Sequence, residues 1–112
     1  MKVKIATSPF GTAARTSVLL ALSLLSESYP RELARLLDLP LSGVQRALRS
    51  LESDGLIAAR SAGRTRLFRL DPRYFARAEL LALLSRLSEA EDGLKGRVEA
   101  LRRRPRRSGK PL

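Results

Sequence analysis

The sequence contains no cysteine and no histidine among its 112 residues. Disulfide bonds are therefore excluded, as are zinc sites built from Cys and His, and we expect neither a metal nor another cofactor. The most common catalytic base and the thiol nucleophile are missing as well. Because the sequence also shows no nucleophile–base pair and no phosphate-binding glycine loop, we do not expect an enzyme.

Long apolar runs are also missing. The longest, SVLLALSLLS at residues 17–26, has about ten residues, which is too short to cross a bilayer. The first residues, MKVKIATSPFG, lack the apolar core of a signal peptide. We therefore expect a cytoplasmic protein that does not enter the membrane and that associates with the nucleoid.

Aromatic residues are few, namely three Phe, two Tyr and no Trp, so one small core must be built mainly from Leu, Ala and Val. Positive charge is in excess instead. The sequence has 22 Lys and Arg but only 11 Asp and Glu, which gives a net charge of +11. Such a surface attracts polyanions, and we favour a nucleic acid over a merely solubilising role for the charge. The shortage of aromatics for base stacking disfavours single-stranded RNA.

Hydrophobic periodicity predicts a first helix over residues 13–26, with Thr12 as its N-cap. This helix is apolar on more than one side, so we expect it at the centre of the core. Pro30 suits the first position of a second helix, whose inward stripe would be Leu33, Leu36 and Leu37. The alternation in KVKIA indicates a short strand at residues 2–6.

A short connection, DLPL at residues 38–41, separates the second helix from a third at about residues 42–54. Two helices joined so closely cross sharply, as in a helix-turn-helix. Ser42 and Gln45 fit a capping box at the start of the third helix, and Gly55 suits the left-handed residue after its end.

The third helix has two distinct faces on a helical wheel. We expect one face to be buried, and it consists of Val44, Ala47, Leu48 and Leu51. The other face has no acidic residue and carries Ser42, Gln45, Arg46, Arg49 and Ser53. Arg can bind guanine through two hydrogen bonds, Gln can bind adenine and Ser either, so this face suits base edges. Gly43 would allow DNA to approach the backbone closely. The alternative is the ordinary solvated face of an amphipathic helix.

Two short segments around Gly63 predict a β-hairpin. Arg64 and Arg66 flank Thr65 near its tip, and the wing so formed, at about residues 61–66, would lie along the minor groove or the phosphates. The alternative is a plain turn whose arginines serve solubility.

Residues 31–71, RELARLLDLPLSGVQRALRSLESDGLIAARSAGRTRLFRLD, resemble the winged helix-turn-helix of ArsR/MarR-type transcriptional regulators. The flanks FGTAART (10–16) and DPRYFARAELLALL (71–84) resemble the same family. The resemblance implies a dimeric, repressor-like protein with its third helix in the major groove of DNA. By position, it implies DNA contacts from Arg31, Ser42, Gly43, Gln45, Arg46, Arg49, Arg64, Thr65 and Arg66. Metal-sensing ArsR proteins use Cys or His ligands, which this sequence lacks.

A long helical segment is expected from about residue 73 to about residue 104, and a second capping box, Ser88 with Glu91, would break it in two. A heptad-like seam runs along this segment through Leu80, Leu84, Leu87, Leu94, Val98 and Leu101. We expect this seam to be a homodimer interface, with Leu81 and Leu83 packing on the first helix. The alternative is that the whole segment closes the core of its own domain.

The predicted fold is therefore mainly α with a small β-hairpin, an α+β winged helix-turn-helix with a C-terminal dimerisation helix. Residues 1–73 would form the DNA-binding domain, residues 74–101 the dimerisation segment, and residues 102–112 a basic disordered tail. The predicted function is sequence-specific binding of double-stranded DNA by a transcriptional repressor. The alternative is a winged-helix module that docks a protein partner and holds nucleic acid non-specifically.

Overall fold

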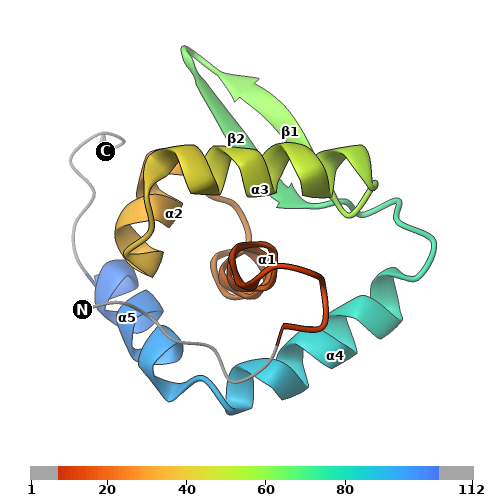
Figure 1. Cartoon of the computed structure of the whole chain (residues 1–112), viewed down its shortest axis with the longest axis vertical. Helices are drawn as coiled ribbons and strands as arrows, with labels where there is room; N and C mark the ends of the chain where they lie inside the picture. The colour runs from red at the N-terminus through yellow and green to blue at the C-terminus, as the bar shows by residue number, and fades with distance from the viewer. Residues whose placement is uncertain (1–7, 104–112) are drawn as a thin grey trace.

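The computed structural model describes residues 8–103, which form five helices and one antiparallel hairpin (Figure 1). In chain order these are α1 (Ala13–Leu25), α2 (Pro30–Leu37), α3 (Leu41–Ser53), β1 (Ile57–Ala62), β2 (Thr65–Leu70), α4 (Arg77–Glu89) and α5 (Asp92–Arg103). The predicted class, mainly helical with a hairpin after the third helix, is confirmed. The strand predicted at residues 2–6 and the tail beyond residue 103 lie outside the described residues.

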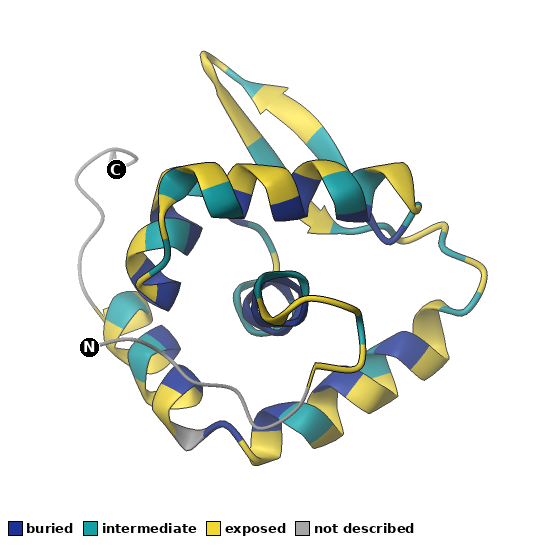
Figure 2. Cartoon of the chain, viewed as in Figure 1, coloured by how far each residue is buried: buried dark blue, intermediate teal, exposed yellow. Residues whose placement is uncertain are grey.

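Helix α1 runs through the middle of the molecule, and the other four helices surround it (Figure 1). The hydroxyl of Thr12 caps its start by accepting a hydrogen bond from the N–H of Arg15 at 3.1 Å. Every residue from Thr16 to Leu22 is buried, so the central turns have no side that faces solvent (Figure 2). The central position predicted from the two-sided apolar pattern is confirmed.

Helices α2 and α3 form the helix-turn-helix. Helix α2 begins at Pro30, and the chain turns at Asp38, whose φ of 56° is left-handed. Both predicted apolar stripes are confirmed, since all their members are buried: Leu33, Leu36, Leu37, Val44, Ala47, Leu48 and Leu51. The capping box predicted at Ser42 is wrong, because α3 begins one residue earlier, with Pro40 as its N-cap and no side chain capping it.

In the hairpin, β1 pairs with β2 from Ile57 opposite Leu70 to Ala62 opposite Thr65. Gly63 and Arg64 form the turn between the strands. The φ of Gly63 is 64°, a left-handed value that glycine adopts readily in two-residue hairpin turns. The base of the hairpin is anchored in the core, and its distal half is largely exposed (Figure 2).

The C-terminal segment consists of two helices, α4 and α5, which confirms the break predicted near Ser88. None of the helices within residues 8–103 is long and apolar enough to span a membrane. The break falls after Glu89, and Ser88 lies inside α4, where its hydroxyl donates to the carbonyl oxygen of Ser85 at 2.8 Å. Ser88 therefore does not cap α5 as the sequence predicted. Helix α5 includes Arg102 and Arg103, which the sequence assigned to the tail.

The predicted dimer seam packs inward, which corrects its assignment to a subunit interface. Leu87 packs against the core of its own chain, and four other members are buried in that core: Leu80, Leu84, Leu94 and Val98. The turn between α4 and α5 allows both helices to direct the same apolar side towards α1. Leu83, which we expected to pack on α1, is instead 43% exposed.

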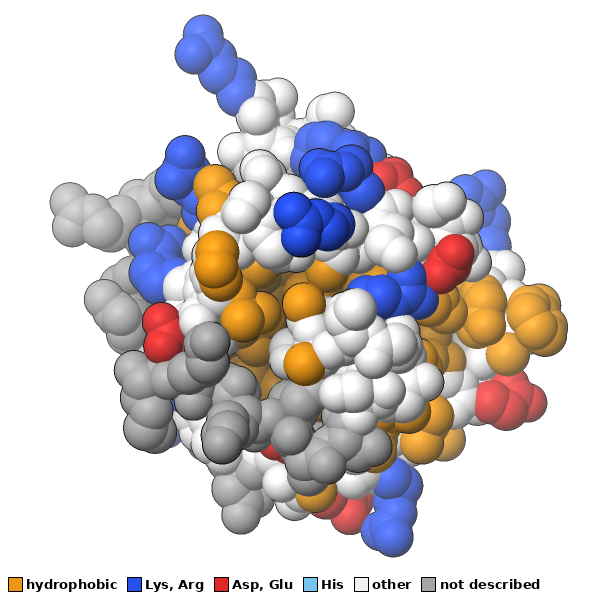
Figure 3. Space-filling model, viewed as in Figure 1, with side chains coloured by type: hydrophobic (Ala, Val, Ile, Leu, Met, Phe, Trp, Pro, Cys, Tyr) orange, Lys and Arg blue, Asp and Glu red, His pale blue; other side chains and the backbone are white. Residues whose placement is uncertain are grey.

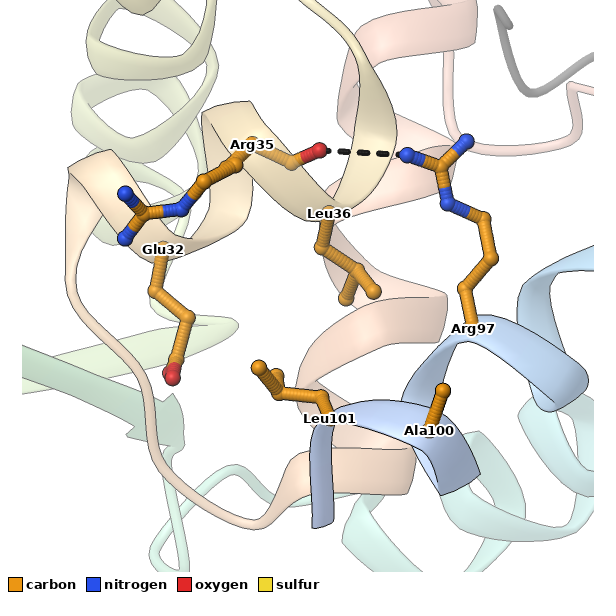
Figure 4. Close-up of a pocket in the computed structure, with 6 residues that line it drawn as sticks. All are labelled: Glu32, Arg35, Leu36, Arg97, Ala100 and Leu101. Carbon is orange, nitrogen blue, oxygen red and sulfur yellow. Dashed lines mark hydrogen bonds between the residues drawn. The ribbon is translucent and has the colours of Figure 1, made fainter. Parts of the chain in front are cut away.

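Leu101, the last member of the predicted seam, lines a hollow between α2 and α5 together with Leu36 and Ala100 (Figure 4). Beside it the guanidinium of Arg97 donates to the carbonyl oxygen of Arg35 at 3.2 Å. This hydrogen bond ties α5 to α2 and completes the enclosure of α1.

The variant Leu84→Ala should lower the free energy of unfolding by about 2–5 kcal/mol, because it leaves a cavity at a fully buried site. The same truncation one residue earlier, Leu83→Ala, should cost less than about 1 kcal/mol because Leu83 is partly exposed. Urea denaturation followed by circular dichroism measures both. If Leu84→Ala changed the oligomeric state and left the free energy of unfolding unchanged, the inward packing of the seam would be refuted.

Candidate nucleic-acid interface

A groove of about 440 Å³ runs between α3 and the hairpin. Three parts of the chain line it: the connection into α2, one side of α3, and the hairpin. No Asp or Glu side chain is among the lining residues, which are Tyr29, Pro30, Arg31, Leu41, Gln45, Leu48, Arg49, Arg64, Thr65, Arg66 and Phe68. Six of the nine residues predicted to contact DNA are therefore brought together in one groove.

A short backbone pairing places Arg31 in this groove. The N–H of Ser28 donates to the carbonyl oxygen of Phe68 at 3.0 Å, and the N–H of Phe68 donates back to Ser28 at 2.7 Å. The connection between α1 and α2 thus adds to the edge of the hairpin. The buried hydroxyl of Ser28 also donates to the carboxylate of Glu32 at 2.7 Å. These contacts hold the first turn of α2, and Arg31 with it, against the base of the wing.

The outer face of α3 carries Gln45, Arg46 and Arg49, all of them exposed. Burial of the opposite stripe fixes this orientation, because side chains that point away from a buried helical stripe must face solvent. Within residues 8–103, no acidic side chain forms an ion pair with any of Arg31, Arg46, Arg49 or Arg64. Their donors therefore remain available to an anionic partner. Lys and Arg side chains gather over α3 and at the hairpin tip in Figure 3.

Arg66 differs from the other arginines of the groove because an acidic residue holds it. Its guanidinium lies 2.9 Å from the carboxylate of Glu52 on α3 and 5.1 Å from the centre of the Phe68 ring. The ion pair is exposed and so contributes little to stability. It nevertheless connects the wing to α3.

The remaining three predicted residues lie outside the groove. Gly43 and Arg46 line a smaller hollow on the other flank of α3, opposite the start of α1, and Ser42 is exposed and lines neither hollow. A Cβ at Gly43 would meet no protein atom within 4 Å, so packing does not require glycine there.

Sequence reasoning missed the role of Arg15, which ties α1 to α3. Its guanidinium donates to the carbonyl oxygen of Phe10 at 2.7 Å, to the hydroxyl of Ser50, and to the carboxylate of Asp54 at 2.8 Å. The side chain is only 17% exposed. The available signal was that Arg15 is the one charged residue of α1.

A second ion pair braces the hairpin from its other strand. Arg60 on β1 donates to both carboxylate oxygens of Glu27, from Nε at 2.9 Å and from Nη2 at 3.1 Å. The hydrogen bonds from Arg60 lower the pKa of Glu27. Burial of the carboxyl acts in the opposite direction, and the positive charge of Arg60 lowers the pKa further. The same contact raises the pKa of Arg60. Two ion pairs, one from each strand, therefore link the wing to the helical body.

No protein-family model matches the sequence, and no curated protein matches it. Solved structures do match. A MarR family transcription regulator aligns with a TM-score of 0.59 and 22% identity, over 76% of this chain and 56% of its own. The adhesin competence repressor AdcR from Streptococcus pyogenes aligns with a TM-score of 0.60 and 17% identity, over 80% of this chain and 66% of its own.

A variant of ZitR from Lactococcus lactis, solved in complex with DNA, aligns with a TM-score of 0.60 and 18% identity, over 88% of this chain and 66% of its own. At such identities the likeness establishes the fold, and it confirms a winged helix-turn-helix like that of MarR-type regulators. One of the three proteins is described as a MarR family regulator and none as an ArsR-type protein, so the resemblance to an ArsR/MarR type drawn from the sequence is limited to the MarR type. The chain spans between 56% and 66% of the length of these three proteins.

The Glu27 carboxyl should titrate below the usual range of a glutamate, and Arg60→Ala should raise its pKa towards that range. Because the pKa is lower in the folded state, the pair stabilises the protein above the unfolded-state pKa, and this stabilisation disappears as the pH falls through the folded-state value. A carboxyl-carbon NMR titration measures the pKa. Arg69→Ala is the matched control and should shift it less, since Arg69 contributes the smallest of the effects on Glu27. Equal pKa values in wild type and Arg60→Ala would contradict the brace.

Proposed function

We propose that this protein is a transcriptional repressor that binds double-stranded DNA in a sequence-specific manner. The observation that carries the proposal is the acid-free groove between α3 and the hairpin, to which three separate parts of the chain contribute Arg31, Arg49 and Arg64. A merely solvated helix face would not require basic residues from three elements to converge. An anionic partner that lies across all three elements explains the convergence.

The geometry suits base contacts from α3 and phosphate contacts from the start of α2 and the tip of the wing. Gln45 and Arg49 project from α3, and their side chains match adenine and guanine edges in a major groove. Arg31 at the start of α2 and Arg64 at the wing tip flank α3, where the two phosphate backbones of the groove would lie. Arg46 extends the basic surface beyond the groove. The open space at Gly43 would allow DNA to approach the backbone of α3 closely.

The structural neighbours support the same proposal. One is described as a MarR family transcription regulator, one as a repressor, and one was solved in complex with DNA. None of these descriptions names an enzyme. We further propose that the protein acts as a homodimer, through a surface other than the seam that the sequence suggested.

Selection of bound duplexes from a random pool tests the proposal, and a defined motif should be enriched. Against the enriched duplex, Arg49→Ala should weaken binding by about 1–3 kcal/mol and relax the preference at one base position. Arg73→Ala removes the same charge from an exposed side chain beyond β2 and should preserve the base preference. Fluorescence anisotropy at fixed salt measures both affinities.

The wing should behave differently from α3. Arg64→Ala should weaken binding to all duplexes alike. It should also reduce the slope of the logarithm of affinity against the logarithm of salt concentration by about one, because one fewer phosphate is neutralised. If no motif were enriched and Arg49→Ala bound every duplex as wild type does, the DNA-reading function would be wrong. That result would favour a winged helix that docks a protein partner.

A further inference from the structure

Four arginines line the groove between α3 and the hairpin, and one of them differs from the others in its surroundings. Three of them, Arg31, Arg49 and Arg64, form no ion pair with an Asp or Glu within residues 8–103. Arg66 instead donates from Nη2 to the carboxylate of Glu52 on α3 at 2.9 Å. Such a pair carries no net charge, so it adds nothing to the attraction of the groove for a polyanion.

The alternation of side chains along β2 directs Arg66 towards the helical body. Successive side chains of a strand point to opposite faces, so Arg66 shares a face of β2 with Phe68. Phe68 is buried in the core, and this face is therefore the one that packs inward. The guanidinium of Arg66 lies 5.1 Å from the centre of the Phe68 ring, close enough for a cation–π contact. The backbone thus brings Arg66 to Glu52, in the last turn of α3.

A DNA phosphate would compete with Glu52 for this guanidinium. The side chain of Arg66 is 55% exposed and lines the groove, so a phosphate oxygen could reach it once Glu52 released it. An exposed ion pair and a single phosphate contact are both weak, so the competition is close. Transfer of Arg66 to a phosphate has a second cost, because it leaves the carboxylate of Glu52 unpaired beside the negative charge of the DNA. This repulsion favours the existing pair.

We propose that Glu52 withholds Arg66 from DNA and thereby limits the affinity of the groove for every duplex. The resemblance drawn from the sequence implied a DNA contact from Arg66, and the proposal assigns this side chain to Glu52 instead. A phosphate contact carries no sequence information, so Glu52 affects how tightly the protein binds and leaves the base preference to α3. The proposal rests on the proposed function, because it concerns the same groove.

The variant Glu52→Gln removes the negative charge, keeps the shape of the side chain and should release Arg66 to a phosphate. Its affinity for a random-sequence duplex should rise about threefold to tenfold at low salt. The slope of the logarithm of affinity against the logarithm of salt concentration should steepen by about one, because one more phosphate is neutralised. Fluorescence anisotropy over a series of salt concentrations measures both. Glu79→Gln removes the same charge from an exposed position of α4, across α1 from α3 (Figure 1), and should change neither.

Substitution of Arg66 separates its release from the mere loss of a negative charge. In the wild type, Arg66→Gln should lower the affinity, because it leaves Glu52 unpaired, and should not change the salt slope. In the Glu52→Gln background the same substitution should return the steepened slope to the wild-type value. A Glu52→Gln variant that binds no more tightly than wild type would overturn the proposal. So would a steeper slope that persists in Glu52→Gln/Arg66→Gln, or a slope that Arg66→Gln alone reduces by about one.

Folding and base preference serve as the checks on these variants. The ion pair is exposed, so thermal unfolding followed by circular dichroism should be nearly unchanged. Wild type and Glu52→Gln should select the same motif from a random pool. A wild type that enriches no motif contradicts the proposed function, while the response of the random duplex to Glu52→Gln still tests the role of Glu52. An enriched motif without tighter binding by Glu52→Gln contradicts only the role of Glu52.

Discussion

The burial of α1 on all sides is the constraint on which the rest of the structure depends. A helix whose residues from Thr16 to Leu22 are all buried must be surrounded, and here the other four helices and strand β2 pack around it. The apolar side of each surrounding helix packs against α1. These helices are α2, α3, α4 and α5. The C-terminal leucines therefore pack inward, where a coiled-coil pattern alone would have allowed them to face another subunit.

This enclosure decides which surfaces remain for partners. Since every helix around α1 directs its apolar stripe inward, only outer faces are available, and these differ in chemistry. The outer face of α3 is basic and joins a groove with the hairpin, whereas the outer face of α4 mixes small, large and oppositely charged side chains. The two faces lie on opposite sides of α1 (Figure 1).

Local patterns in the sequence predicted much of the fold and of the site. Thr12, Pro30 and Gly55 marked element ends correctly, and the stripe around Leu48 correctly identified the buried side of α3. These features depend on residues close in sequence. The direction of the C-terminal seam depends instead on how α4 and α5 pack around α1, which heptad spacing does not encode. Capping was mispredicted at Ser42 because Pro40 already supplies the extended residue before α3.

The ion pairs that position the wing could not be predicted from spacing either. Glu52 and Arg66, or Glu27 and Arg60, meet only because the chain folds back between them, and each looked like an ordinary surface charge. The same holds for Arg31, which enters the groove because Ser28 pairs with Phe68. The sequence indicated which side chains suit DNA, and the tertiary contacts determine which of them act together.

The most direct test of the central claim, that the groove between α3 and the hairpin is the DNA-binding surface, is an amide NMR titration with the selected duplex. The account predicts that the largest shift changes map to Gln45, Arg49 and residues 64–66, and that α4 and α5 change little. Changes concentrated instead on α5 and the hollow beside Arg97, with the groove unaffected, would contradict it.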